Sequence, residues 1–246
     1  MYPHLYTAAS GLISSRRELE IVADNLANVR TPGFRPARAI FAVRGGQPAP
    51  AAGPPPMTTV PIGVRLADVW HPVRTPPLRA TGNPFDMAID GRGWFQVRTP
   101  SGIRLTRAGN FTRGEGNRLV TPDGHPVLDR AGRPITLPDG TLEVAADGTL
   151  SVDGQPAGQL AVVDIPEAAL VREGGTLWRS TAGTPRPIDP AGVRIRPGHL
   201  EESGVEATEE LVAMIEAQRL FEMNQRLIDV TANTVARRAL ELAGVR

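Results

Sequence analysis

Residues 211–242 read LVAMIEAQRLFEMNQRLIDVTANTVARRALEL, and this stretch decides the expected architecture. Alternating steps of three and four from Leu211 reach a series that is apolar everywhere except at Gln218 and Gln225. Such a heptad seam predicts one long helix that packs against another helix, with the two glutamines fixing register and partner at some cost in stability. The seam comprises Leu211, Met214, Gln218, Phe221, Gln225, Ile228, Ala232, Val235, Ala239 and Leu242.

A second helix is expected near the start of the chain, where a leucine recurs every seven residues. This spacing gives the helix one apolar stripe. The run Thr31-Pro32-Gly33 should end it, because proline disfavours helix at the preceding residue and glycine permits a turn. The recurring residues are Leu5, Leu12, Leu19 and Leu26.

The chain between these helices has a different composition. Residues 34–62 contain the run GGQPAPAAGPPPMTTVP at positions 45–61, which predicts an exposed, extended linker. Residues 63–198 hold short apolar runs separated by Asp-Gly pairs, which are signals of tight turns. The pattern predicts a β-rich domain built of antiparallel hairpins. The pairs begin at Asp90, Asp123, Asp139, Asp147 and Asp153.

We therefore expect a mixed α and β chain, with a central all-β domain of antiparallel hairpins flanked by long N- and C-terminal helices. The helices should pack as a coiled-coil-like layer. The expected segments are an N-terminal helix and turn at 1–33, a linker at 34–62, a β-rich domain at 63–198 and a C-terminal helix at 199–246. A β domain of this size cannot cover both helices along their length, so they must pack against each other or against further chains.

The composition limits the chemistry that the chain can perform. It has no cysteine, which excludes disulfides, Cys-ligated zinc, iron–sulfur clusters and a thiol nucleophile. Its four histidines share no metal-ligand spacing, so we expect no metal and no cofactor. The net charge of +1 offers no strong field for nucleic acid. No apolar run approaches the ~18 residues of a membrane helix, so no membrane insertion is expected.

An enzymatic alternative rests on Asp86 and Asp90, which could act as paired carboxylates of a glycan hydrolase. Asp90 precedes Gly91, however, and a turn-forming aspartate is expected at such a place. A second alternative is a cell-envelope binding module whose two helices pair within one chain. We favour a non-enzymatic protein.

Three groups of residues, placed at both ends and in the middle of the chain, resemble bacterial flagellar rod and hook proteins. The family commonly reads (A/V)-x-N-N-L-A-N-x-x-T-x-G-(F/Y) near its N-terminus, and Asp24 stands here where an Asn is frequent. The C-terminal group has Gly204 where the family usually has Asn. The matching stretches are residues 6–12 and 23–34, residues 82–95 and 106–111, and residues 200–205 and 214–219.

The resemblance implies a structural subunit of the flagellar basal-body rod, which transmits torque for motility. It implies export by the flagellar type III apparatus, a place in the periplasm-spanning rod and contacts with other rod and hook-family subunits. Terminal segments of this family fold into an inner tube on assembly. The modest length favours a proximal rod protein, with a distal rod protein as the alternative. Asn25 and Asn28 are then expected to belong to the assembly interface together with the two leucine-rich seams, as polar contacts between helix and turn.

Overall fold

The computed structural model describes residues 3–45, 61–72, 76–181, 183, 185–189, 192 and 194–244. For residues 3–6, 44, 45, 61, 62, 235, 236 and 238–243 it describes the backbone alone. The chain forms two compact units. We call the first the helical unit (Met1–Ala27, Pro36–Pro72 and Glu206–Arg246) and the second the β unit (Asn28–Arg35 and Val73–Val205).

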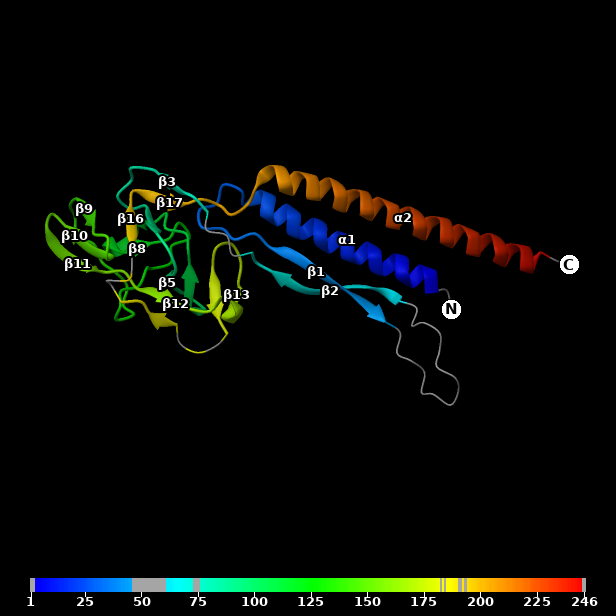
Figure 1. The fold of residues 1–246 in the computed structure, drawn as a ribbon, viewed down its shortest axis with the longest axis horizontal. Coiled ribbons are helices and arrows are strands. Elements are labelled where there is room, and N and C mark those ends of the chain that lie inside the picture. Colours follow the sequence, from blue (N-terminus) through cyan, green and yellow to red (C-terminus); the bar gives the residue numbers. More distant parts are fainter. Residues whose placement is uncertain are drawn as a thin grey trace. The chain divides into compact units, whose positions relative to one another are not determined.

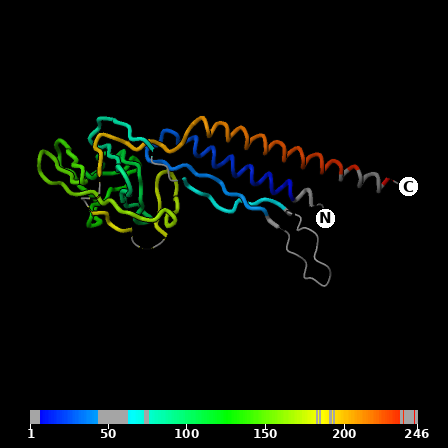
Figure 2. The backbone as a smooth tube through the Cα atoms, viewed as in Figure 1, coloured from blue at the N-terminus to red at the C-terminus, as the bar shows by residue number. Residues whose placement is uncertain are grey.

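Two antiparallel helices and one β-hairpin make up the helical unit (Figure 1). The helices α1 (Pro3–Ala27) and α2 (Ala207–Ala243) lie side by side, as both terminal heptad patterns predicted. The strands β1 (Arg38–Gly45) and β2 (Pro61–Trp70) pair with each other, and β2 packs along α1 (Figure 2). Acidic residues Glu209 and Glu210 occupy the first turn of α2, where they complement the helix dipole.

The β1-β2 hairpin belongs to a different part of the chain from the one that the expected domain boundaries assign to it. Strand β1 lies inside the expected linker at 34–62, and β2 begins at the end of that linker and continues into the expected β-rich domain, yet both belong with the helices. Residues 46–60 of the Pro/Gly-rich run lie outside the described residues. Residues 28–35, expected to belong partly with the N-terminal helix, pack instead as a part of the β unit.

The β unit is centred on a six-stranded sheet in the order β13-β14-β6-β5-β12-β15. A three-stranded sheet, β11-β10-β9, and the pairs β16-β4, β17-β3 and β7-β8 complete it, with all of the pairings antiparallel. The expected hairpin architecture is thus confirmed. The strands are β3 (Leu78–Ala80), β4 (Met87–Ile89), β5 (Trp94–Thr99), β6 (Gly102–Thr106), β7 (Thr112–Arg113), β8 (Leu119–Val120), β9 (Leu142–Val144), β10 (Thr149–Val152), β11 (Gln155–Gln159), β12 (Val162–Asp164), β13 (Leu170–Arg172), β14 (Trp178–Ser180), β15 (Arg186–Pro187), β16 (Ile195–Pro197) and β17 (His199–Glu201).

Neighbouring residues of β5 face two separate hydrophobic clusters. Phe95 is in the larger cluster and stacks edge-on against Phe111, with the ring centroids 5.2 Å apart. Trp94 is in the smaller cluster and lies against Trp178, with the centroids 5.7 Å apart. Because successive strand residues point to opposite faces, one strand supplies both clusters. The β unit therefore has a closed core of its own.

Candidate assembly surface

Small and polar residues form the centre of the contact between α1 and α2. Ala8, Ser15 and Val22 on α1 are buried, as is Ala217 on α2. A Cβ atom at Gly11 would lie only 2.8 Å from the Oδ1 atom of Asn224, so the two helices approach closely there. On the other side of α1, the amide of Val64 in β2 donates a 3.1 Å hydrogen bond to the Ser10 hydroxyl.

A buried polar cluster stabilises the end of the helix pair at which α1 ends and α2 begins. Asn25, fully buried, donates to the carbonyl of Ala37 and accepts from its amide, both at 2.8 Å. Its amide nitrogen also lies 3.1 Å from the carboxylate of Glu210. Glu210 is fully buried and pairs with Arg38 at 2.7 Å. The cluster therefore joins the end of α1, the start of β1 and the first turn of α2.

The negative charge of Glu18 on α1 is unfavourable in the contact between the two helices. Burial raises the pKa of the Glu18 carboxyl above its usual value, and the negative charge of Glu216 on α2 adds to that rise. By contrast, hydrogen bonds and charges from Arg17 and Arg16 lower the pKa of the exposed Glu20 carboxyl. Protonation of Glu18 therefore favours helix pairing.

The structure brings the two expected seams together only in part. The side chains that line the flanks of the helix contact are half-buried: Leu12, Leu19, Leu26, Met214, Phe221 and Ile228. Leu211, Gln218 and Gln225 are exposed, and the side chains of Leu5 and Val235 lie outside the described residues. The contact stripe on α2 thus departs from the expected seam at every second position. Ala217 and Asn224 replace Gln218 and Gln225, because small residues allow the backbones to approach more closely than glutamine does.

Asn28 has a different place from Asn25. It is half-buried in the β unit, where its carbonyl accepts from the Thr31 amide and its side chain accepts from the Thr31 hydroxyl, both at 3.1 Å. Asn28 therefore stabilises the turn that follows α1.

Sequence reasoning missed a second apolar stripe on α2. Leu220, Met223, Leu227 and Val230 recur in steps of three and four, so they lie on one helix face, and all four are exposed. The hairpin adds Ile40, Val43, Val64, Val69 and Trp70, of which Val43 and Val64 are register partners. All the exposed large hydrophobic side chains that the structure describes lie in the helical unit, apart from Ile103 and Val171.

The carboxylates considered for glycan hydrolysis have structural partners. Asp86 is buried and its carboxylate accepts from the side chain of Asn83 at 3.2 Å. Asp90 pairs with Arg196 at 3.1 Å, across the β4-β16 ladder. Within the described part of the chain, no group of His, Asp and Glu residues is arranged to hold a metal ion. Neither described helix has an apolar stretch long enough to span a bilayer.

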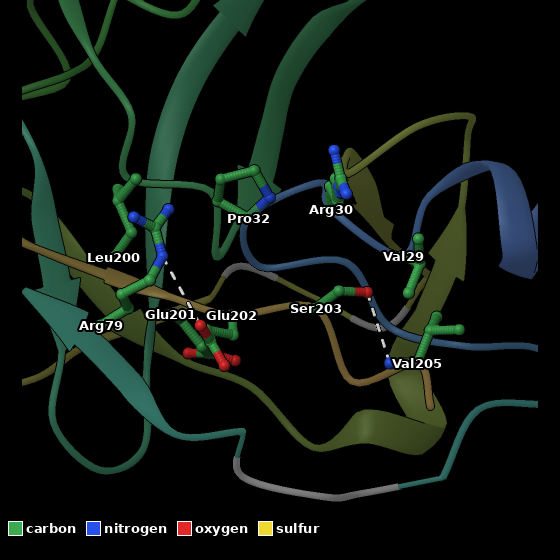
Figure 3. A pocket seen from close by; sticks show the side chains of 9 residues that line it. All are labelled: Val29, Arg30, Pro32, Arg79, Leu200, Glu201, Glu202, Ser203 and Val205. Atoms are coloured by element: carbon green, nitrogen blue, oxygen red, sulfur yellow. Dashed lines mark hydrogen bonds and ion pairs between the residues drawn. The ribbon is translucent and has the colours of Figure 1, made fainter. Parts of the chain in front are cut away.

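A pocket of about 380 Å³ lies in the β unit (Figure 3). Residues of the 28–35 loop form one wall, and the segment that leaves β17 forms another. Arg79 and Glu202 form an ion pair of 3.5 Å in its lining, and the Ser203 hydroxyl accepts from the Val205 amide at 3.3 Å. The pocket marks the place where these two segments of the chain meet.

Comparison with known proteins identifies the chain. It is 35% identical over 238 residues to the flagellar basal-body rod protein FlgF of Mesorhizobium japonicum, covering 95% of both chains. The chain belongs to the flagellar basal-body rod protein family. This rod protein is also 34% identical to FlgF of Caulobacter vibrioides, covering 98% of this chain and 97% of that one. It is 33% identical to the rod protein FlgG of Buchnera aphidicola subsp. Acyrthosiphon pisum, covering 94% and 96%.

Three protein-family models match separate parts of the rod protein. "Flagella basal body rod protein" matches residues 5–35, and "Flagellar basal body rod FlgEFG protein C-terminal" matches residues 196–242. "Flagellar hook protein FlgE/F/G D1 domain" matches residues 88–152, in the β unit. The protein is a structural subunit of the flagellar basal-body rod, as the motifs at both ends of the chain predicted.

Proposed function

We propose that this rod protein joins related rod and hook-family subunits through its helical unit, and that the resulting layer carries torque toward the hook. The observation that carries the proposal is the contrast in burial between the units. The β unit has a closed hydrophobic core of its own, whereas the only buried hydrophobic residues described in the helical unit are Ala8, Val22, Ala37 and Ala217. Fully burying a leucine or phenylalanine is worth about 1.5–3 kcal/mol, so the half-buried seam residues favour association.

The arrangement of the exposed apolar side chains supports a helical assembly. One set lies on α2 and another on the hairpin, so the two sets are different surfaces of the same unit. Contact between two different surfaces is heterologous, and heterologous contacts that do not close generate helical polymers. In this proposal the seam side chains Leu12, Leu19, Leu26, Leu211, Met214, Phe221 and Ile228 reach neighbouring subunits. Leu5 and Val235 extend the seam, and Gln218 and Gln225 set its register.

The test replaces one exposed residue of the α2 stripe. Leu227→Asp should prevent rod assembly and abolish swimming, because it places a charge in the buried contact between subunits. Asn233→Asp is the matched control, since it adds the same charge at an exposed polar position of the same helix. The purified Leu227→Asp chain should keep the melting temperature of its β unit. Normal swimming by the Leu227→Asp strain would overturn the proposal.

We further propose a place in the proximal rod, after export in an unfolded state by the flagellar type III apparatus. The run Arg219-Leu220-Phe221-Glu222-Met223 and the opening Tyr6-Thr7-Ala8 support the proximal position. Basal bodies purified from cells that lack this chain should then contain no distal rod subunits. Basal bodies that retain distal rod subunits would contradict the proximal assignment without affecting the structural role.

A further inference from the structure

The loop of residues 28–35 leaves the helical unit after α1, packs within the β unit and returns to the helical unit before β1. The chain therefore passes between the units at residues 27–28, 35–36, 72–73 and 205–206. Without the packing of this loop, only the last two links would connect the units mechanically. The contacts that hold the loop thus decide how many links carry force.

Two backbone hydrogen bonds hold this loop at the adjacent residues Gly33 and Phe34. The Gly33 amide donates to the carbonyl of Glu201 at 2.9 Å, and the Gly204 amide donates to the carbonyl of Phe34 at 2.9 Å. Gly33 adopts a φ of +65°, and a Cβ atom there would lie 2.4 Å from the carbonyl carbon of Arg107. The loop is therefore pressed against the chain that follows β6 and against the chain that leaves β17.

Phe34 fills the space behind this backbone contact. Its side chain is fully buried, and the guanidinium of Arg172 lies 4.4 Å above its ring. An aromatic ring buried in this way makes a large contact area and adds a cation–π interaction. The loop is thus anchored by apolar packing as well as by hydrogen bonds.

A buried ionic cluster completes the anchor. Glu201 is 1% exposed and contacts Arg35 of the loop at 3.4 Å and Arg107 at 3.2 Å. Both guanidiniums also lie 5.8 Å from the ring of Trp94. Burial raises the pKa of the Glu201 carboxyl, and Arg107 and Arg35 offset part of that rise. Removing the carboxylate would leave two buried cations facing each other, so Glu201 holds the loop electrostatically.

We propose that residues 28–35 are a force-bearing anchor, fastened by Phe34 and the Arg35–Glu201–Arg107 cluster, through which load on the β unit reaches α1 and β1 directly. This inference rests on the proposed torque-carrying function. It assigns Glu201 and Phe34 as positioning residues of that function. A loosened anchor leaves the assembly surfaces of the helical unit intact, because none of the anchor residues belongs to them.

The experiment compares Glu201→Gln with Glu202→Gln, a neighbouring change that removes only an ion pair between half-exposed side chains. Hydrogen–deuterium exchange of the purified full chain should rise at least about tenfold in peptides covering 28–35 for Glu201→Gln. Exchange in β9 and β10, which supply none of the residues of the cluster, should stay unchanged. Cells carrying Glu201→Gln should still assemble rods and filaments, but the shear force that breaks tethered cells from their flagella should fall about twofold or more relative to Glu202→Gln, because fewer links carry the load.

The outcomes separate the anchor from the assembly function. Assembled rods that break at the same shear force, or unchanged exchange in 28–35, would overturn the anchor and leave the proposed function standing. If Glu201→Gln prevents folding, Phe34→Leu decides by the same two measurements, because it loosens the loop through a cavity without altering charge. Loss of rods with Leu227→Asp but not with Phe34→Leu places assembly and force transfer on different residues.

Discussion

Gly11 on α1 faces Asn224 on α2 so closely that an added Cβ would lie 2.8 Å from the Asn224 Oδ1 atom. The nearby atom is the end of a flexible side chain, which can rotate away. Close approach of the two helices therefore depends on this glycine together with the conformation of one amide.

A double-mutant cycle tests this relationship. Gly11→Ala alone should change stability little, because a gain of about 1 kcal/mol in helix propensity is offset by displacement of the Asn224 amide. Gly11→Ala in an Asn224→Ala background should stabilise by about 1 kcal/mol, since the obstacle is gone. Thermal melting followed by far-ultraviolet circular dichroism measures both. Equal effects in the two backgrounds would show that Gly11 and Asn224 do not interact.

The buried cluster of Asn25, Glu210 and Arg38 gives a second prediction. Glu210→Ala should destabilise the helical unit by about 2–3 kcal/mol, because the side chain of Asn25 and the guanidinium of Arg38 lose their shared partner. Glu209→Ala is the control, since Glu209 is half-exposed and lies 3.8 Å from Arg38. It should cost less than about 0.5 kcal/mol. Urea unfolding of the two variants measures the difference, and similar midpoints would contradict the structural role of Glu210.

Much of this architecture was predictable because it is encoded by local patterns. The heptads of the terminal segments indicated α1 and α2, and Asp147-Gly148 and Asp153-Gly154 mark the turns of the β9-β10-β11 meander. The β1-β2 hairpin was missed because its strands are separated by a long Pro/Gly-rich run and carry no tight-turn signal. Pairing over such a distance depends on packing against α1, which no local pattern reports.

The candidate site was less predictable than the fold. A heptad pattern weights large apolar residues, so it selected Gln218 and Gln225 by spacing and overlooked Ala217 and Asn224, which make the close contact. The family resemblance indicated Asn25 but not its partner Glu210, which is 185 residues away. Likewise, Glu201 and Arg35 are ordinary charged residues in the sequence, and only the fold shows that they are buried together.

The raised pKa of Glu18 predicts a pH dependence of helix pairing. The carboxyl titrates near 4.5 in the unfolded chain and above that value in the folded chain. The folded state therefore binds the proton more tightly, so this stabilisation is fully present below about pH 4.5 and is lost as the pH rises through the folded pKa. Glu18→Gln should accordingly stabilise the helical unit at neutral pH and weaken its response to acid.

Glu20→Gln is an informative control, because the pKa of the Glu20 carboxyl is shifted in the opposite direction to that of Glu18. Hydrogen bonds from Arg17 and Arg16 lower the pKa of the Glu20 carboxyl, so its stabilisation is present above the unfolded pKa and lost as the pH falls through the folded one. At about pH 7 the melting temperature should therefore rise for Glu18→Gln and fall for Glu20→Gln relative to the unsubstituted chain, and both differences should shrink at about pH 4. Shifts of the same sign would contradict the burial of Glu18 against α2.

The β unit contains a glycine whose role is purely steric. A Cβ atom at Gly109 would lie 1.6 Å from the carbonyl oxygen of Met87. The Met87 backbone cannot move away easily, because its amide donates a 3.0 Å hydrogen bond to the carbonyl of Gly109. Met87 itself belongs to the larger hydrophobic cluster, and Phe111 of the same cluster follows Gly109 by two residues. Gly109→Ala should therefore cost more than about 3 kcal/mol and prevent the β unit from folding stably.

Gly124→Ala separates this steric effect from backbone strain. Gly124 has a φ of +82°, and no atom lies within 4 Å of the position that its Cβ would occupy. The substitution should cost only about 1–2 kcal/mol, the strain of a left-handed alanine. Tryptophan fluorescence during urea unfolding reports on the β unit through Trp94 and Trp178, which are both buried there. Gly109 has no positive φ, so equal losses for the two variants would contradict the steric role assigned to its close approach to Met87.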